Sequence, residues 1–285
     1  MKKLLIENLF PAHYEIVESI IIKYNDLFNN KINNNVSIYL SIGSPQSGWY
    51  VKDNSFKKYI NDKYPDITFQ RIHDFDYYIN CTVYDKDYYN LNNSISSNKK
   101  YISHEITDRL KQNPNVFFLT PLSKNNYVYA DVLPFMHIKK KTNIPIYIIQ
   151  GCLNSNRRHL LLLIKILSNK FNFDYKIKLI GRGHFPNELI PFKEKIILKD
   201  NLNFIDYHKE FVDGYCILPL ISKQSHPHYY TNKLTSTISY AKAYDLTCII
   251  DKDLQDIYHL KNIEIYKNDN DIIRAFQKTL HKFYL

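Results

Sequence analysis

The chain has no run of apolar residues that approaches the roughly 18 to 20 needed to cross a bilayer. Its first residues, MKKLLIENLF, carry the lysines of a signal peptide, but only Leu4 to Ile6 form an apolar core before Glu7 and Asn8. We therefore expect an intracellular protein of the cytoplasm, at most peripheral to a membrane. That cytoplasm is the host's if the source is viral.

Cysteines are few, and none of them has a short paired spacing. The four are Cys81, Cys152, Cys216 and Cys248, and three of them lie inside apolar runs. Zinc sites and disulfide frameworks both depend on paired cysteines, so this pattern argues against either. It predicts buried free thiols in a reducing compartment.

Glycine is also scarce, at 6 of 285 residues, whereas Asn, Ile, Lys and Tyr are abundant. This bias is typical of an AT-rich genome such as that of a large virus or a low-GC bacterium. No internal repeat of fixed period is present. The net charge of +10 predicts an anionic partner, and a nucleotide, a nucleic acid and an acidic membrane surface all fit it.

Apolar runs alternate with helical patterns along the chain, as in α/β proteins. In the first half the pattern predicts strands at 4–6, 36–42, 67–72, 77–84, 100–103 and 116–119, and helices at 14–28 and 54–63. In the second half it predicts strands at 146–150, 176–180, 203–206, 215–221, 246–250 and 263–266, and helices at 154–170, 186–195, 208–212, 232–244, near 254 and at 271–283. The run HIKKKTNIP, from His137 to Pro145, combines charge with a proline and is the best linker candidate. We therefore expect one domain over 1–140 and another over 144–268, followed by a C-terminal helix over 269–285.

One stretch, Gly214 to Asp251, reads as strand, polar loop, helix and strand, which is a βαβ unit with parallel strands. The loop follows the carboxyl end of its first strand, where open α/β sheets bind ligands. With Thr231 as the cap, the helix would begin beside Lys233, and its free N–H groups would suit the phosphates of a nucleotide. The alternative is an ordinary helix whose lysine meets only solvent.

Two other turns in the second half combine glycine with arginine. GCLNSNRR runs from Gly151 to Arg157 and Arg158, and the triplet Gly181-Arg182-Gly183 follows the strand IKLI. Glycine allows a close approach of the backbone, and the arginines could neutralise a diphosphate. Alternatively, both arginines of the first turn are solvated.

With these motifs in place, the second half resembles the donor-binding domain of glycosyltransferases of the GT-B fold, group 1 kind. The resemblance covers about residues 144–285 and includes IKLIGRG, NFIDYHKEF, ILPL and TCIID in the family's order. It implies an α/β protein with two Rossmann-like domains facing across a cleft, and a last helix that packs back on the first domain through Ile272, Ile273, Phe276 and Leu280. The donor-binding residues that it implies are Gly151, Arg157, Arg158, Gly181, Arg182, Gly183, His228, Tyr229, Tyr230, Asn232, Lys233, Thr235 and Ser236.

The resemblance implies transfer of a hexose or pentose from a nucleoside-diphosphate sugar, with UDP favoured, to a hydroxyl of a glycan, lipid or protein. It implies inversion, no metal and no cofactor beyond the donor, and no nucleic-acid partner. The family's paired glutamates are absent, and Tyr229, Tyr230, Asn232 and Lys233 stand in their place. This departure affects the ribose contact, the sugar specificity and a retaining stereochemistry.

Among inverting members of the family, a histidine after the first strand acts as the base that deprotonates the acceptor, and His13 occupies that place. An imidazole with a pKa near ~6.5 can accept a proton at neutral pH. His104 and Glu105 form a second candidate pair, because they end the strand KKYIS. Asp74 and Asp76 precede a strand and should point away from the cleft.

Several alternatives remain. Asp251-Lys252-Asp253 has the Asp-x-Asp shape with which GT-A enzymes bind a metal, although it comes late in the chain. The charge and the 15% aromatic content would suit a nucleic-acid binder, but the basic residues are dispersed. A GT-B scaffold that has lost catalysis is compatible with the missing glutamates. An epimerase on the same scaffold would lack its carboxylates.

Overall fold

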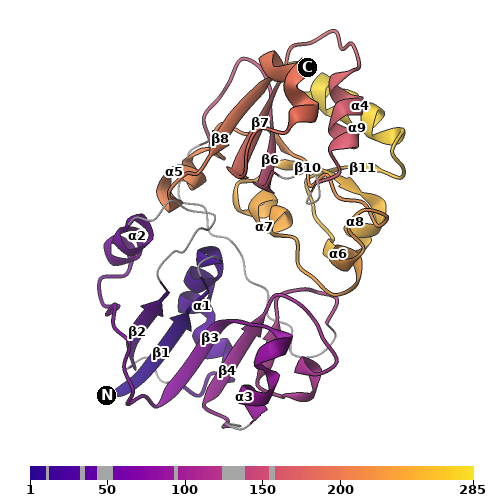
Figure 1. Cartoon of the computed structure of the whole chain (residues 1–285). Coiled ribbons are helices and arrows are strands. Elements are labelled where there is room, and N and C mark those ends of the chain that lie inside the picture. Colours follow the sequence, from indigo (N-terminus) through magenta and orange to yellow (C-terminus); the bar gives the residue numbers. More distant parts are fainter. Residues whose placement is uncertain (11–12, 33–35, 44–53, 93–95, 124–138, 154–157) are drawn as a thin grey trace. The chain divides into compact units, whose positions relative to one another are not determined.

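A computed structural model describes residues 1–10, 13–32, 36–43, 54–92, 96–123, 139–153 and 158–285. The chain forms two compact units. The first comprises Met1–Leu133 and a short later segment, Asn232–Leu234; the second comprises Pro134–Thr231 and Thr235–Leu285. Each unit is built on its own parallel sheet (Figure 1).

The sheet of the first unit has the strand order β2-β1-β3-β4-β5. Its strands are β1 (Lys2–Asn8), β2 (Val36–Ile42), β3 (Tyr77–Val83), β4 (Lys99–Ser103) and β5 (Val116–Phe118). All neighbouring pairs are parallel. The order reverses between β1 and β3, and ligands of open α/β sheets bind beside such a switch point.

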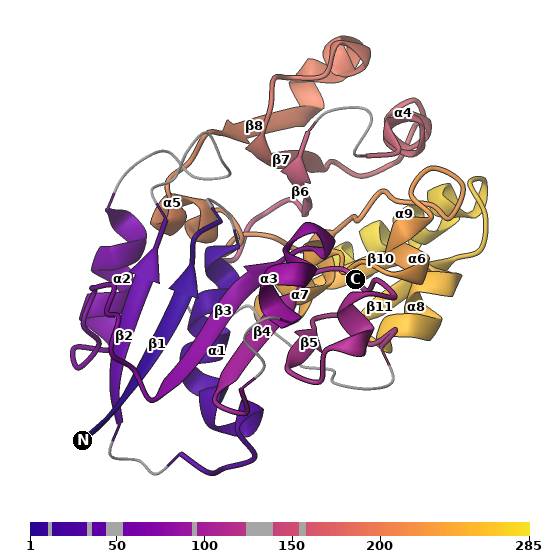
Figure 2. The same cartoon turned by 60° about the horizontal axis from the view of Figure 1, so that its bottom comes forward.

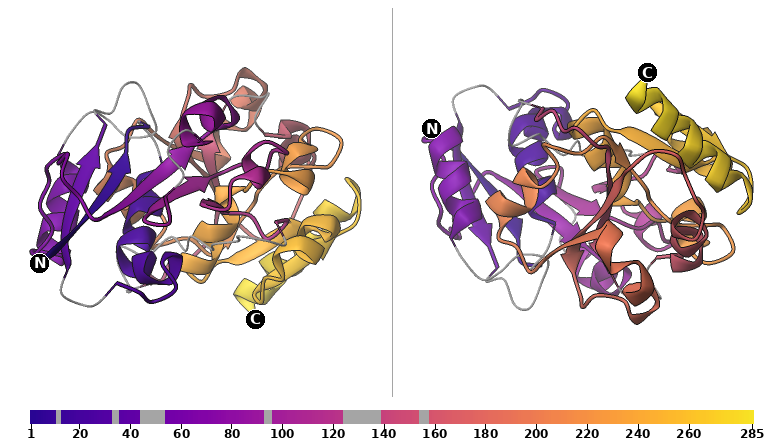
Figure 3. Two further views of the ribbon diagram at one scale, coloured as in Figure 1. Left: turned by 90° about the horizontal axis from the view of Figure 1, so that it is seen from below. Right: turned by 90° about the horizontal axis from the view of Figure 1, so that it is seen from above.

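Helices lie on both sides of this first sheet. They are α1 (Tyr14–Leu27), α2 (Ser55–Lys63) and the short α3 (Tyr88–Asn92), with 3₁₀ turns at Asp85–Asp87 and Leu110–Gln112. Figure 3 shows α1 and α3 on opposite sides of the sheet. The period of 3.6 that predicted α1 places Ile16, Val17 and Ile20 in the core. Within the described residues, α3 is only five residues long and covers less of its face of the sheet than the 14-residue α1 covers of the other.

The sheet of the second unit has the order β11-β10-β9-β6-β7-β8. Its strands are β6 (Ile146–Cys152), β7 (Lys176–Arg182), β8 (Ile196–Asp200), β9 (Cys216–Ile217), β10 (Thr247–Asp251) and β11 (Ile263–Tyr266). Its helices are α4 (Leu160–Leu167), α5 (Phe204–Lys209), α6 (His228–Thr231), α7 (Ser236–Ala243), α8 (Lys252–Tyr258) and α9 (Asp271–Tyr284), with a 3₁₀ helix at Asn187–Lys195 (Figure 2). The predicted βαβ unit is confirmed, because β9 and β10 pair in parallel. Its switch point lies between β6 and β9.

The last helix, α9, belongs to the core of the second unit. Ile272, Phe276 and Leu280 are buried there beside Tyr147 of β6, whose hydroxyl hydrogen-bonds Thr279 at 3.0 Å. Burial of an apolar helix face is worth about 25 cal/mol for each Å² removed from water. The apolar face expected to pack back on the first domain therefore finds its burial within its own unit.

Some expected elements differ from the structure. Residues 203–206 begin helix α5, with Asn203 as its N-cap, because the Asn203 side chain accepts a hydrogen bond from the backbone of Asp206. The strand predicted at 67–72 is reduced to a single bridge between Tyr39 and Thr68. Strand β8 was not predicted from the sequence. The residues of the predicted weak helix 186–195 are wound as 3₁₀ helix with Pro191 inside.

Burial agrees with two features of the composition. Cys81, Cys216 and Cys248 are buried free thiols, as predicted, and Cys152 is a half-buried one. Among the described residues, the helices are all too short or too polar to span a membrane.

Candidate functional site

His13 lies at the carboxyl edge of the first sheet, between the end of β1 and the start of α1. It is the N-cap residue of α1 and adopts the left-handed conformation, with φ 68° and ψ 31°. A non-glycine residue there stores about 1 to 3 kcal/mol of backbone strain. Its position follows the strand next to the switch point of this sheet.

The imidazole of His13 lies against the imidazole of His104. The two ring centroids are 3.7 Å apart, with the ring planes tilted by 35°. On its other side His13 stacks with Phe10 at 5.4 Å. Its Nδ1 lies 3.4 Å from Oε1 of Glu15, and its side chain keeps 26% exposure. The two histidines that were separate candidates in the sequence thus form one cluster.

His104 is buried, and its pKa is lowered well below the usual value. Burial is the main cause, and the nearby charges of His13 and Lys233 add to it. Its buried Nε2 makes no hydrogen bond within the described part of the chain. His104 is therefore a neutral imidazole at neutral pH, so the cluster does not hold two cations face to face.

Glu105 and Lys233 complete the first unit's cluster through the segment Asn232–Leu234. The N–H of Ile106 donates to the carbonyl of Asn232 at 2.7 Å, and the N–H of Leu234 donates to the carbonyl of His104 at 3.3 Å. The Lys233 ammonium lies 3.9 Å from the Glu105 carboxylate. The segment is extended here because Glu105 and Lys233 form an antiparallel bridge.

This bridge corrects the predicted start of the later helix. Helix α7 begins at Ser236 with Thr235 as N-cap, whereas Thr231 ends the separate four-residue α6. Lys233 therefore precedes the helix by three positions. A lysine that pairs with backbone of another segment cannot occupy the first turn of α7.

The carboxyl edge of the second sheet has two glycines side by side. Gly151 ends β6 and is paired with Gly181 of β7. A Cβ built on Gly181 would lie 1.8 Å from the carbonyl oxygen of Gly151, and its φ is 153°. Gly183 also has a positive φ, of 128°, while the side chain of Arg182 is exposed. Glycine is thus required here for close packing of the strand ends.

Gln150 connects this edge to the start of α7. Its Nε2 donates to Ser236 Oγ at 3.1 Å and to Thr237 Oγ1 at 2.9 Å. Its Oε1 accepts from the Tyr207 hydroxyl at 2.7 Å. The first turn of α7 is therefore fixed beside the end of β6. Sequence reasoning missed Gln150, although a polar residue at the end of the apolar run IYIIQ was a usable signal.

Arg158 is buried rather than solvated. Its guanidinium donates to the carbonyl of Gln150, and burial lowers its pKa while Tyr229, a hydrogen-bond partner, opposes this. A buried guanidinium costs free energy unless its donors are used, and the bond to Gln150 offsets part of that cost. Arg157 lies outside the described residues.

The other candidates of the second unit have local partners. His228 and Tyr229 are half-buried, with ring centroids 4.2 Å apart, and the buried Tyr230 hydroxyl donates to the carbonyl of Ile221. Asp251 accepts from the backbone N–H groups of Asp253 and Leu254 as the N-cap of α8. That capping role explains the Asp-x-Asp pattern, and two parallel sheets exclude the GT-A alternative. Among the described residues, no group of three or more His, Cys, Asp and Glu could hold a metal ion.

The two aspartates of the first unit are structural. Asp74 forms an ion pair with Lys3 at 2.9 Å, and Asp76 accepts from the backbone N–H of Lys3 at 2.8 Å. Both are exposed and tie the segment before β3 to β1.

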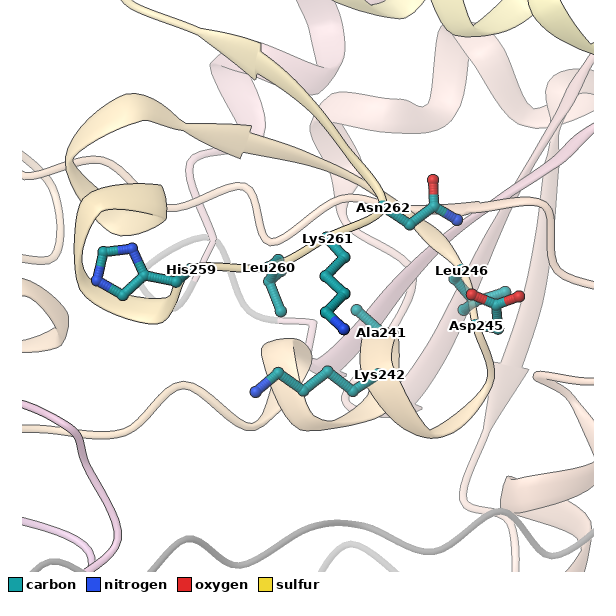
Figure 4. Close-up of a pocket in the computed structure, with 8 residues that line it drawn as sticks. All are labelled: Ala241, Lys242, Asp245, Leu246, His259, Leu260, Lys261 and Asn262. Atoms are coloured by element: carbon teal, nitrogen blue, oxygen red, sulfur yellow. The ribbon is translucent and has the colours of Figure 1, made fainter.

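A cavity of about 300 Å³ lies elsewhere in the second unit. It is lined by Ala241, Lys242, Asp245, Leu246, His259, Leu260, Lys261 and Asn262 (Figure 4). These residues precede β10 and β11, so the cavity is at the amino ends of those strands. It is therefore not the carboxyl edge from which the predicted donor residues come.

Comparisons with known proteins identify the fold alone. No family model matches the chain, and no curated protein matches it either. The lipopolysaccharide outer core galactosyltransferase WaaB in its apo form shares 14% identity at a TM-score of 0.56, covering 99% of this chain and 91% of its own. AviGT4, a glycosyltransferase of avilamycin A biosynthesis, shares 11% identity at a TM-score of 0.60, and the match covers 99% of this chain and 88% of AviGT4. MnaA of S. aureus, solved with UDP, shares 8% identity at a TM-score of 0.50, and the match covers 99% of this chain and 90% of MnaA. The chain thus has the predicted GT-B fold of two Rossmann-like domains.

Proposed function

We propose that the chain is a glycosyltransferase that moves a sugar from a nucleoside-diphosphate sugar to a hydroxyl acceptor, with inversion and without a metal ion. The observation that carries the proposal is the histidine pair of the first unit, His13 against a neutral His104, in a chain with the GT-B fold. Similar structures include two named glycosyltransferases and one protein solved with UDP. UDP is therefore the nucleotide to test first.

His13 is the proposed base. When the acceptor oxygen attacks the anomeric carbon, Nε2 of His13 takes the hydroxyl proton, and the bond from that carbon to the diphosphate oxygen breaks. Glu15 Oε1, 3.4 Å from Nδ1, would accept a hydrogen bond from the Nδ1–H group and stabilise the imidazolium that forms. This single displacement joins the sugar to the acceptor oxygen with inverted configuration at the anomeric carbon. The nucleoside diphosphate is the leaving group and keeps the electron pair of the broken bond.

His104 supports this chemistry by remaining uncharged. A second imidazolium at 3.7 Å would oppose protonation of His13, because like charges disfavour each other at short range. A neutral ring instead gives His13 a flat surface that fixes its orientation. His104 is thus a positioning residue in this proposal.

The second unit would bind the donor at the carboxyl edge of its sheet. The eight-residue helix α7 begins at Ser236, and Gln150 holds that first turn beside the ends of β6 and β7. Free N–H groups and the helix dipole favour a diphosphate there. Arg182 is exposed at the same edge and could add a cation. This is the leaving-group stabilisation that a metal provides in other enzymes.

The test is a screen of UDP-, GDP-, CMP- and dTDP-sugars by thermal denaturation of the whole chain. A donor at 100 times its dissociation constant should stabilise the folded state by about 2.7 kcal/mol. Arg182→Ala should reduce the shift, whereas Lys242→Ala, a lysine at the amino ends of the strands, is the matched control. If no nucleotide sugar or nucleoside diphosphate stabilises the chain, the transferase proposal is wrong.

A second candidate is a GT-B scaffold that binds nucleotide sugars without transferring them. It is favoured by the pairing of Lys233 with Glu105, because that lysine stands where the family has a glutamate. Donor binding would then persist with no release of nucleoside diphosphate in the presence of any acceptor. Release that depends on His13 would exclude this candidate.

A further inference from the structure

One face of the first sheet carries a pocket of about 290 Å³ that the transferase proposal does not use. The parallel register aligns Leu5 with Tyr78 and Lys99 across three strands, and Glu7 with Asn80 and Tyr101 in the next row. Side chains two residues apart along a strand point to the same face. These six residues therefore form the floor of the pocket.

In the described part of the chain this face of the sheet is only partly covered, which leaves room for the pocket. The long helix α1 lies on the other side of the sheet (Figure 3). Here the cover consists of Asn90 and Leu91 of the short α3 and of the segment 71–75 that leads into β3. Phe75 of that segment stacks on Tyr78, with ring centroids 5.4 Å apart. Space remains between the two covering segments.

Glu7 is the unusual group of this floor. Its side chain is only 4% exposed, and its Oε2 accepts from the Tyr78 hydroxyl at 2.7 Å. Oε1 lies 2.9 Å from Nε of Arg71, but it has no hydrogen-bond donor in good geometry among the described residues. A buried carboxylate oxygen without a donor costs free energy. A ligand hydroxyl in the pocket would supply that donor.

The remaining lining suits a neutral ligand rich in hydroxyls. Burial and the bond to Glu7 raise the pKa of Tyr78, so its hydroxyl stays protonated. Asn80 offers an amide and Lys99 an ammonium, while the rings of Phe75, Tyr78 and Tyr101 offer apolar surface to C–H groups. Arg71 offsets the charge of Glu7, so the pocket does not select a cation.

We propose that this pocket binds a sugar residue, with one sugar hydroxyl donating to Oε1 of Glu7 and the C–H face of the ring against the aromatic side chains. Its volume of about 290 Å³ lies just below the roughly 300 to 1,000 Å³ of small-molecule pockets, which fits one sugar unit or two. The site is on the face of the sheet, not at the strand ends where His13 lies. It therefore holds a sugar other than the one transferred, and it does not depend on the proposed transfer.

The experiment is saturation-transfer NMR of the full chain with the methyl glycosides of glucose, galactose, mannose and N-acetylglucosamine, and with their common disaccharides. We expect at least one to bind in the millimolar range without any nucleotide. Glu7→Gln should weaken that binding about tenfold, because a hydrogen bond to a charged oxygen becomes one to a neutral oxygen. Ile72→Trp, on the covering segment, should block binding by filling the pocket.

Glu18→Gln is the matched control. Glu18 is also a carboxylate with 4% exposure that accepts from a tyrosine hydroxyl, Tyr59, and pairs with a surface cation, Lys63, but it does not line the pocket. It should lose stability much as Glu7→Gln does and still bind sugar as the wild type does. The inference is overturned if no sugar of the panel binds, or if Glu7→Gln and Ile72→Trp bind like the wild type. UDP-induced stabilisation of the same variants separates this failure from a failure of the transferase proposal.

Discussion

The rings of His13 and His104 have their centroids 3.7 Å apart, although 90 residues separate them in the sequence. One follows β1 and the other follows β4, and the parallel sheet brings both strand ends to one edge. Burial of His104 keeps that ring neutral, whereas the His13 side chain keeps 26% exposure. The pair therefore has one buried, neutral member and one partly exposed member.

The first prediction concerns the pH dependence of folding. The folded-state pKa of His104 is lowered, so below a pH of about 6.5 the unfolded chain takes up a proton at this residue that the folded chain does not. Titration of His104 therefore leaves the free energy of unfolding unchanged above that pH. Below it, the free energy of unfolding falls by up to about 1.4 kcal/mol per pH unit. Urea unfolding of the wild type and His104→Gln at pH 7.5 and at lower pH measures it. The variant should lose less stability on acidification, and equal losses would contradict the prediction.

The second prediction concerns Lys178 in the middle of β7. Its side chain is 3% exposed, and its ammonium lies 3.0 Å from Glu210 and 2.5 Å from Asp213. Lys178→Ala leaves these carboxylates without their shared cation and should cost about 3 to 5 kcal/mol. Lys199 pairs with the same Glu210 at 3.0 Å but is 40% exposed, so Lys199→Ala should cost less than about 1 kcal/mol. Chemical denaturation of both variants measures the two losses of stability. Similar losses would contradict the prediction that the burial of Lys178 makes its ion pairs the more costly to remove.

The third prediction concerns the glycines of the second sheet. Gly181→Ala would place a Cβ 1.8 Å from the backbone oxygen of Gly151 at a φ of 153°, and should cost about 3 kcal/mol or more. Gly214→Ala meets the flexible end of Ile148 at 2.4 Å, so we expect about 1 to 3 kcal/mol. Thermal melts and urea midpoints of the two variants should rank them in this order. A Gly181→Ala variant as stable as Gly214→Ala would contradict the packing described for the strand ends.

The periodic elements could be predicted from the sequence. Strand β2, strand β11 and helix α1 have bounds within a residue of those expected, because their apolar residues repeat at 2.0 or 3.6 positions. The strand predicted at 203–206 was wrong for a local reason. Its short apolar pair is compatible with either a strand or a helix, and the N-cap Asn203 stabilises the helix. Such short runs carry no period from which to choose.

The site was predicted only in part, because tertiary pairing overrides local pattern. His13 and His104 were each identified from a strand end, but their contact depends on strand order, which the sequence does not state. The start of α7 was placed too early because Asn232–Leu234 pairs with Glu105, a partner 128 residues away from Lys233. Gln150 and Glu7 each end an otherwise apolar run, which marks them as unusual, but the sequence does not show which distant residues their side chains contact.

The central claim is that His13 removes the acceptor proton. The direct measurement is the release of nucleoside diphosphate from the donor found by the screen, with and without a hydroxyl acceptor, for the wild type, His13→Ala and His13→Asn. Asparagine tolerates the left-handed backbone of this position, so His13→Asn keeps the fold but cannot act as the base. We predict that both variants bind the donor with unchanged stabilisation and lose about 10² to 10⁴ in acceptor-dependent turnover. Turnover equal to that of the wild type in His13→Asn would contradict the account.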